Sequence, residues 1–205
     1  GVLPSFALNF DTIASDFTFT RSTTSTFLNE NGLIETSPTD TPRIDYSTGE
    51  AAFLLEPQST NLITNSEDFN GSANAVVTSD SETSPRGLVD ASEVTFDGTA
   101  FGRVEQFIST TIGETYTFSV YLKNKNLNDV TQVWLGFSQS AQGGFVTITN
   151  EWQRYEISVV ADGSTEYPRV QYSDTGSMYV WGMQVEELSY ATSYIPTEGS
   201  TVTRS

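Results

Sequence analysis

The sequence contains no cysteine and no histidine among its 205 residues. Without cysteine there are no disulfides and no thiol nucleophile, while the redox compartment stays undecided. Without histidine, Ser-His-Asp and Cys-His catalytic arrangements are excluded, and a transition-metal site is disfavoured because its usual ligands are missing. A paired-carboxylate glycosidase stays open among 26 acidic residues, yet no pair is marked by an apolar setting. We therefore expect a protein that is not an enzyme.

Basic residues are scarce, with 9 against 26 acidic ones and a net charge of -17. A field of this sign repels phosphate backbones and anionic membranes, which argues against nucleic acid as a partner. No apolar run reaches the roughly 18 to 20 residues that span a bilayer, and the N-terminus lacks a charged region followed by an apolar one. We expect no membrane insertion.

Strand signals dominate what is present. Thr, Ser, Asn and Gly are abundant, aromatic residues make up 12 %, and stretches of helix-forming residues are missing. Several segments alternate apolar and polar residues at spacings of about ten residues with turns between them, which predicts an antiparallel β-sandwich. These strands are expected at residues 115–123, 132–138, 145–149, 153–160 and 177–186, with a turn at Gly143 and Gly144.

Alternation also predicts which side chains face the core. In residues 115–123 the core set is Tyr116, Phe118, Val120 and Leu122, which turns Tyr121 to the opposite face. In residues 132–138 the core set is Val133, Leu135 and Phe137, which turns Trp134 outward. In residues 177–186 we expect Tyr179, Trp181, Met183 and Val185 inward, with Gly182, Gln184 and Glu186 on the other face.

The chain divides into three parts. Residues 1–60 read as short strands and turns, among them strands at 6–10 and 16–21 and a turn at Asn31 and Gly32, and they are expected to pack on the sandwich. Residues 61–188 form the sandwich. Residues 189–205 form an extended tail or linker, because Pro196 prevents a helix, and this tail is expected to lead to a further domain or a partner chain.

Several stretches carry a family resemblance. FTFTRSTTSTFLNENGLIET (17–36), PRIDYSTGEAAFLLEPQSTNLITNSEDF (42–69), GETYTFSVYLK (113–123), EWQRYEISV (151–159) and WGMQVEELSYATSYIPTEGSTVTR (181–204) keep the motif order of modules in tailed-phage virion proteins and prophage genes. The central part also resembles galactose-binding-like jelly-roll modules of carbohydrate-active proteins. The resemblance implies a phage surface protein, extracellular on the virion, whose jelly-roll sandwich binds glycans.

The sequence suggests either no cofactor or a structural calcium ion. Galactose-binding-like modules commonly hold a structural calcium with one acidic residue near the first strand and another on the last strand, often in an Asp-Asp pair, but here Trp181 and Gly182 occupy the last-strand positions. Acidic residues that remain as oxygen ligands are Glu67 with Asp68, Asp90 with Glu93, and Glu186 with Glu187. We take Glu67, Asp68 and Glu186 as the candidate ligands, against the alternative of a solvated acidic surface.

Exposed aromatic residues are the candidate sugar-binding groups. Sugars present flat C–H faces on which a ring can stack, while neighbouring amides and charged groups bind the hydroxyls. Tyr121 and Trp134 are the expected stacking residues, and the expected polar partners are Gln184, Arg169, Gln171 and Arg103. The alternative is that Trp134 is covered by residues 1–60 or by a neighbouring subunit.

Two functions follow from these observations. The first is a non-catalytic carbohydrate-binding module of a phage virion, which attaches the particle to a neutral or weakly charged polysaccharide. The second is a structural head-decoration or tail-fibre module that assembles with other virion domains, as a homotrimer if it follows the common form of phage fibres.

Overall fold

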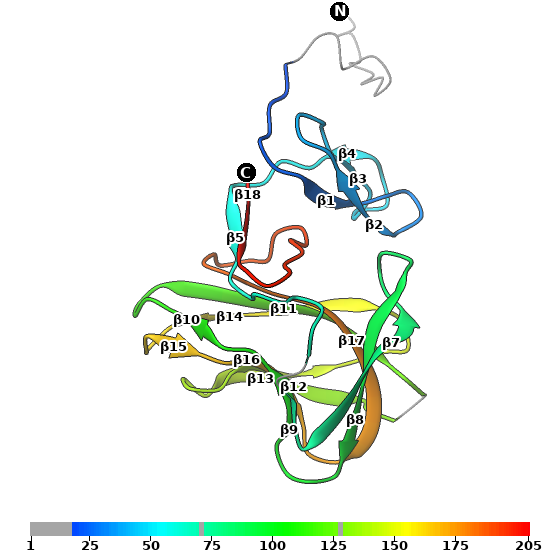
Figure 1. Ribbon diagram of the computed structural model, residues 1–205, viewed down its shortest axis with the longest axis vertical. Helices are drawn as coiled ribbons and strands as arrows, with labels where there is room; N and C mark the ends of the chain where they lie inside the picture. Colours follow the sequence, from blue (N-terminus) through cyan, green and yellow to red (C-terminus); the bar gives the residue numbers. More distant parts are fainter. Residues whose placement is uncertain (1–17, 70–71, 127–128) are drawn as a thin grey trace, which may run out of the picture.

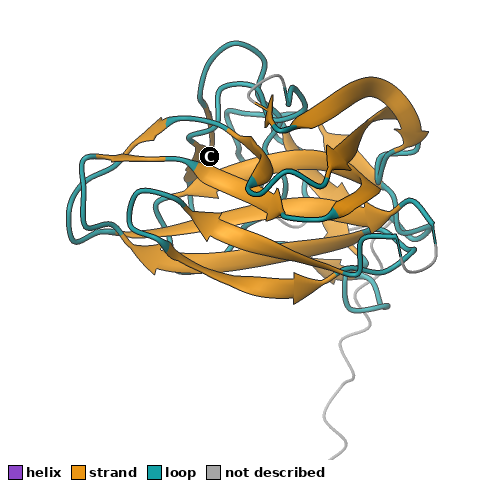
Figure 2. Cartoon of the chain, turned by 90° about the horizontal axis from the view of Figure 1, so that it is seen from below, coloured by secondary structure: helices purple, strands orange, loops and turns teal. Residues whose placement is uncertain are grey.

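The computed structural model describes residues 18–69, 72–126 and 129–205. Within these ranges the chain forms strands and loops only (Figure 2). The described residues therefore contain no helix that could cross a bilayer. In chain order the strands are Ser25–Leu28 (β1), Ile34–Ser37 (β2), Ile44–Asp45 (β3), Ala52–Phe53 (β4), Ser59–Asn61 (β5), Ser72–Ala73 (β6), Ala75–Thr83 (β7), Val89–Asp97 (β8), Gly102–Glu105 (β9), Ile108–Ser109 (β10), Thr115–Asn124 (β11), Gln132–Phe137 (β12), Gln142–Thr147 (β13), Gln153–Val160 (β14), Thr165–Glu166 (β15), Pro168–Tyr172 (β16), Thr175–Glu186 (β17) and Val202–Arg204 (β18).

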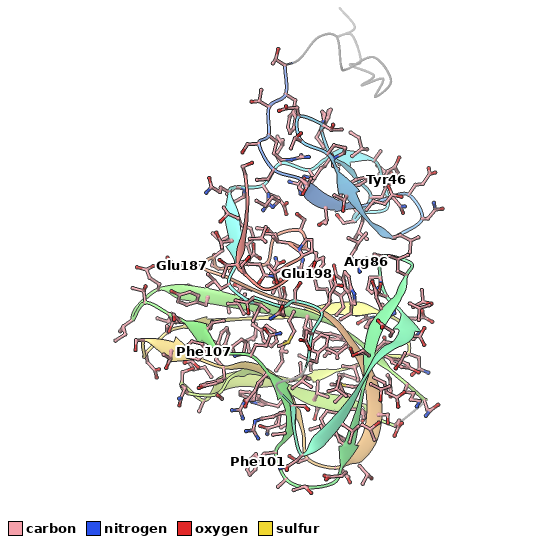
Figure 3. All side chains as sticks on the ribbon, viewed as in Figure 1. Tyr46, Arg86, Phe101, Phe107, Glu187 and Glu198 are labelled. Carbon is pink, nitrogen blue, oxygen red and sulfur yellow. The ribbon has the colours of Figure 1, made fainter. Side chains whose placement is uncertain are left out.

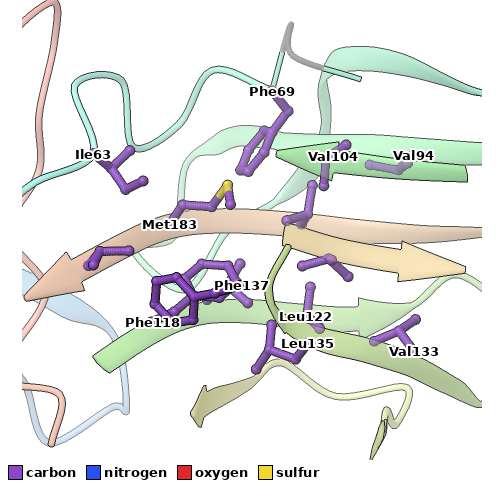
Figure 4. Close-up of a cluster of buried hydrophobic side chains, with 14 of the residues drawn as sticks. Ile63, Phe69, Val94, Val104, Phe118, Leu122, Val133, Leu135, Phe137 and Met183 are labelled. Atoms are coloured by element: carbon purple, nitrogen blue, oxygen red, sulfur yellow. The ribbon is translucent and has the colours of Figure 1, made fainter. Parts of the chain in front are cut away.

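Two five-stranded antiparallel sheets form the sandwich. Sheet A has the strand order β14-β11-β17-β8-β7, and sheet B has the order β13-β12-β16-β9-β6. The core lies between them, where side chains of both sheets are buried together (Figure 4). The predicted core sets of residues 115–123 and 132–138 are all within it. The predicted fold, an antiparallel jelly-roll sandwich with an N-terminal β extension, is confirmed.

The face of β17 was predicted correctly at one end and wrongly at the other. Met183 and Val185 lie in the core as expected, but Trp181 packs in a separate cluster, and Met178 and Val180 take the core positions. The reason is a bulge, since Ser119 pairs with Gln184 and Tyr121 with Trp181, so β17 has one extra residue in between. An extra residue reverses the alternation of a strand.

Gly182 makes this bulge possible. Its φ is +64°, a left-handed conformation that favours glycine. A Cβ at this position would lie 3.2 Å from the Tyr194 ring and 3.3 Å from the Tyr121 ring. Glycine therefore allows two aromatic rings to close over the backbone of β17.

The N-terminal part stands over the outer face of sheet A (Figure 1). Its ladders are β1 with β2 and β3 with β4, joined to neither sheet of the sandwich. The predicted turn at Asn31 and Gly32 connects β1 to β2. The predicted strand at residues 6–10 lies outside the described residues, and residues 18–21 of the one predicted at 16–21 form no strand. We call residues 18–56 the N-terminal unit.

Residues 189–205, which were predicted to form an extended tail or linker, lie against the sandwich. Tyr194 and Ile195 are buried, and β18 returns to pair with β5. Asn61 ties the tail down, because its Nδ2 donates to the carbonyls of Met183 and Ile195 while its Oδ1 accepts from the Val185 amide. The tail and the N-terminal unit together cover the outer face of sheet A.

Candidate functional site

The two predicted stacking residues lie on different sheets. Tyr121 belongs to β11 in sheet A and Trp134 to β12 in sheet B, and each points away from the core between the sheets. A single sugar therefore cannot lie against both rings. The structure divides the predicted site between two faces of the molecule.

Sheet B carries most of the predicted site on its outer face. Register places Phe145, Trp134, Gln171 and Arg103 directly opposite one another on β13, β12, β16 and β9. Directly opposed residues of antiparallel strands point to the same side, and neighbouring strands are about 4.8 Å apart. This row, which we call the sheet-B row, is therefore about 14 Å long. It brings together three predicted residues and adds Phe145, which is 69 % exposed.

The Trp134 indole lies over two glycines. A Cβ on Gly143 would be 2.3 Å from Cζ2 of the indole, and one on Gly136 would be 2.6 Å from Cη2. The ring thus occupies the space that side chains at these positions would fill, and it rests along the sheet instead of standing on it. Half-buried in this way, Trp134 directs its other face outward beside Phe145.

Gly143 and Gly144 were predicted to form a turn, and this was wrong. Both lie inside β13, which begins at Gln142, and Gly143 pairs with Gly136. The predicted strand at 145–149 was therefore placed about three residues too late. Phe145 was missed as a surface residue for the same reason.

Charged side chains lie next to the row on the same face. Arg169 pairs with Glu105 in the register of β16 and β9, and Gln171 pairs with Arg103 one step along. Glu105 forms an ion pair with each guanidinium group, with N···O distances of 2.9 Å to Arg103 and 3.1 Å to Arg169. Burial lowers the pKa of Arg169, although the Glu105 charge acts in the opposite direction.

The amide of Gln171 is held by one of these groups. Arg169 donates to its Oε1 at 3.1 Å, while its Nε2 donates to no group in the described part of the chain. Gln171 thus offers a free, oriented amide donor beside Trp134.

Further aromatic residues border this face. Phe101 and Phe107 lie at the two ends of β9 (Figure 3), and they are 60 % and 53 % exposed. Phe107 contacts Tyr167 edge to face with ring centroids 5.6 Å apart. The alternation of residues 101, 103, 105 and 107 with core residues of β9 was the sequence signal that could have found them.

Gln184 was predicted to face solvent as a sugar-binding residue, and its burial contradicts this. It lies on the outer face of sheet A but is fully buried beneath the tail. Its Oε1 accepts from the Ile195 amide, and its Nε2 donates to Glu186 and to carbonyls of the tail. Tyr121 is only partly covered, with the Arg154 guanidinium 5.5 Å above its ring.

The candidate calcium ligands have other partners. Glu186 is buried and accepts from the amide and hydroxyl of Thr192. Glu67 accepts from Arg86 and from the Tyr194 hydroxyl, and burial raises its pKa despite the opposing Arg86 charge. No group of three acidic side chains within the described ranges is placed to hold a metal ion, so Glu67, Asp68 and Glu186 do not form one site.

A groove opens on the opposite side of the sandwich. It has a volume of about 700 Å³ and lies between the N-terminal unit, the tip of the β7–β8 hairpin and the outer face of sheet A. Tyr121, Lys123 and Arg154 line it from sheet A, and Trp152 lines it from the position just before β14. Of these, the sequence predicted only Tyr121 as a site residue.

No protein-family model and no curated protein matches the chain. Among solved structures it is similar to a carbohydrate-binding module from Cellvibrio mixtus lichenase 5A in complex with cellotriose, with 11 % identity over 63 % of this chain and 96 % of that one and a TM-score of 0.42. A family 35 carbohydrate-binding module from Clostridium thermocellum shows 14 % identity over 56 % and 88 % of the two chains, with a TM-score of 0.41.

A third similar structure is the enzymatically active domain of tailspike protein 4 of bacteriophage CBA120. Identity is 13 % over 61 % of this chain and 21 % of that one, with a TM-score of 0.44. All three TM-scores lie below 0.5, so function is inferred below from the residues of this chain.

Proposed function

We propose that the chain is a non-catalytic carbohydrate-binding module that holds a glycan on the outer face of sheet B. The observation that carries this proposal is the sheet-B row, in which Trp134 and Phe145 are neighbours and continue into Gln171 and Arg103. An aromatic face beside oriented polar groups matches a sugar ring, which has an apolar C–H face and a rim of hydroxyls.

The charge of this face favours a neutral glycan. Arg103 and Arg169 share Glu105, so these three side chains carry one net positive charge and each guanidinium group already has an anionic partner. The chain as a whole carries -17, which repels strongly anionic polymers at long range. A neutral glycan does not compete with Glu105 for the two arginines, and the net charge of the chain does not repel it.

Binding without catalysis fits the surroundings of the carboxylate on this face. A glycosidase needs a protonated acid close to a second carboxylate. Glu105 is held between two guanidinium groups and is not available as a general acid. Such a face can hold a glycan and has no evident means of cleaving it.

We further propose that the module belongs to a virion surface protein that attaches the particle to host or environmental polysaccharide, next to other virion domains. The ordered motif resemblance supports this placement. Many copies on one particle would strengthen weak individual contacts, because linked sites raise the effective concentration. Mass spectrometry of purified particles that encode the chain tests it directly.

A glycan-array screen of the purified chain tests the binding function. We expect saturable binding to a defined neutral glycan, and loss of it in Trp134→Ala while the fold persists. Tyr190→Ala is the matched control, since Tyr190 is another exposed aromatic side chain but lies in the tail. The screen is run with and without calcium, and the proposal expects no difference. If no glycan binds, and Trp134→Ala instead alters the oligomeric state, the face is an assembly surface.

A further inference from the structure

The groove between the N-terminal unit and sheet A has the size of a ligand site. Ligand pockets typically measure about 300 to 1,000 Å³, and this groove measures about 700 Å³. Phe27, Leu28 and Leu33 line it from the N-terminal unit, which lies directly above the hairpin tip that carries Arg86 (Figure 3). It is on the opposite side of the sandwich from the sheet-B row and does not depend on the proposed function.

Arg154 gives the groove an uncompensated positive charge. Every other basic side chain except Arg21 has a carboxylate within 4 Å in the described ranges, whereas Arg154 has none. Its Nη1 donates to the Thr192 carbonyl and its Nη2 to the Ser119 hydroxyl, while its buried Nε has no partner. In a chain with 26 acidic residues, an arginine without a carboxylate is unexpected.

Lys123 adds a second positive charge on the same wall. Its ion pair with Glu82 measures 3.5 Å, the longest among the ion pairs in the described residues. Tyr121 pairs with Arg154 across β11 and β14, and Lys123 is two residues further along β11 on the same face. Two cations, one without a carboxylate and one with a long ion pair, thus line one side of the groove.

Trp152 supplies an aromatic surface beside them. It lies two residues before Arg154 along the chain and lines the groove, half-exposed. Its Nε1 donates to the Thr83 carbonyl at 2.7 Å, which fixes the ring against the β7–β8 hairpin. The Tyr121 ring is not equally available, because the Arg154 guanidinium lies over it.

The acidic residues of the groove already have hydrogen-bond or ion-pair partners. Asp45 is nearly buried and accepts from the Leu28 and Ser47 amides. Glu56 accepts from Arg43 and Ser193. Glu82 accepts from the Thr83 amide at 3.0 Å and lies 3.5 Å from the Lys123 ammonium group.

We propose that this groove binds a uronic acid residue of an acidic glycan. The sugar ring stacks on Trp152, and its carboxylate accepts hydrogen bonds from Arg154 and Lys123. Charge-assisted bonds of this kind are the strong ones, and a carboxylate there meets the charge that the chain itself leaves unpaired. The net charge of -17 repels an approaching polyanion, but at physiological salt this repulsion is screened beyond about 8 Å, and a carboxylate inside the groove lies next to the two cations.

Calorimetric titration of the purified chain with trigalacturonate, trimannuronate and triglucuronate tests the proposal, each beside its neutral hexose counterpart at one ionic strength. We expect at least one uronate to bind and its neutral counterpart to bind at least about tenfold more weakly, since losing one charged hydrogen bond costs about that factor. Lys123→Met should weaken uronate binding about tenfold, and Arg154→Gln at least as much.

Matched controls separate this site from the sheet-B row. Lys125→Met removes the other lysine, which pairs with Glu93 outside the groove, and should leave uronate affinity unchanged. Trp134→Ala should abolish neutral-glycan binding on sheet B and leave uronate binding intact. Lys123 is held only by a long ion pair and by a contact 5.9 Å from the Tyr179 ring centroid, so Lys123→Met should fold and keeps the test valid even if Arg154→Gln fails to fold.

Three results would overturn the proposal. One is the absence of binding to all three uronates by the folded chain, and another is uronate binding that Lys123→Met leaves unchanged or that Trp134→Ala removes. The third is competition by a poly-glutamate peptide at equal potency, which would assign the groove to an acidic protein segment. A negative result on sheet B alone would leave uronate binding standing, so the two proposals fail separately.

Discussion

Trp134 lies over Gly143, in the space where a side chain of that residue would stand. The indole can therefore rest along sheet B only while position 143 has no Cβ. A Cβ at position 143 would also lie 2.6 Å from the Leu135 carbonyl oxygen, so Gly143→Ala should shift both the ring and the β12–β13 pairing beneath it and weaken glycan binding about tenfold or more, although every proposed contact residue is still present. Binding is measured on the glycan that the array identifies.

Gly144→Ala is the control for this variant. Gly144 is the next residue of β13, and the nearest atom to a Cβ there is 3.9 Å away on Ile157. Its affinity should equal that of the unchanged chain. Equal affinities in both variants would show that the resting position of the indole is not needed.

Gln184 should contribute to the stability of the fold, whereas Gln171 should contribute to glycan binding. Gln184→Leu leaves the buried Ile195 amide without its acceptor, and we expect a loss of about 2 to 3 kcal/mol in the free energy of unfolding. Gln171→Leu should change that free energy by no more than about 0.5 kcal/mol, because Gln171 is partly exposed. Denaturant unfolding measures both.

Binding should show the reverse order. Gln171→Leu removes the free amide beside Trp134 and should lower glycan affinity, whereas folded Gln184→Leu should keep it. Loss of affinity in Gln184→Leu with Gln171→Leu unaffected would place the sugar on sheet A.

The bulge at Gly182 should tolerate substitution poorly. Gly182→Ala forces a positive φ on alanine and brings its Cβ to 3.2 Å from Tyr194, so we expect a loss of about 2 to 3 kcal/mol in unfolding free energy. Gly199→Ala has a φ of +80° but no atom within 4 Å of its Cβ, and should cost only about 1 kcal/mol. Thermal unfolding of the two variants measures how much the crowding by the two rings adds to the cost of a positive φ. Equal losses of unfolding free energy in both variants would show that the rings add nothing.

Glu56 should make stability depend on acid pH. Burial alone would raise its pKa, but hydrogen bonds from Ser193 and Arg43 and the charge of Arg204 outweigh burial and lower the pKa below its ordinary 4.5. A lowered pKa means that the ionised form stabilises the fold above pH 4.5, and that this stability is lost as the pH falls through the folded pKa.

Unfolding free energies measured from neutral to acid pH check this. Glu56→Gln should be destabilised by about 3 kcal/mol at neutral pH, because it leaves buried Arg43 without its carboxylate, and the deficit should shrink in acid. Glu67→Gln is the control of opposite sign, since the pKa of Glu67 is raised and its ionisation costs stability as the pH rises. A deficit in Glu56→Gln that does not change with pH would contradict the assignment.

Alternation predicted the sandwich because β11, β12 and β14 each turn one apolar face to the core, and it correctly turned Trp134 outward. It failed where a residue is added, as at Gly182, because a bulge has no periodic signal and reverses every side chain beyond it. The sequence also did not predict that the N-terminal unit and the tail cover the outer face of sheet A. The N-terminal strands are too short to show a periodic pattern, so their position over sheet A could not be predicted. Gln184 was predicted to be a surface residue because its burial depends on long-range contacts with the tail.

The candidate site was predicted in pieces. Trp134, Arg169, Gln171 and Arg103 were found from their polar or aromatic character, but which of them meet depends on strand order, which local sequence does not encode. Tyr121 was grouped with Trp134 because each is an outward aromatic residue of its strand. Arg154 and Trp152 gave no sequence signal, because an unpaired charge is recognisable only once its neighbours are known.

The most direct test of the central claim follows the NMR signals of the indole N–H groups during titration with the neutral glycan. The chain has three tryptophans, and each reports on a different environment: Trp134 on sheet B, Trp152 in the groove and Trp181 in a buried cluster. We predict that the Trp134 signal shifts with saturation while those of Trp152 and Trp181 stay in place. A saturable shift of Trp152 or Trp181 with Trp134 unchanged would contradict the assignment of the glycan to sheet B.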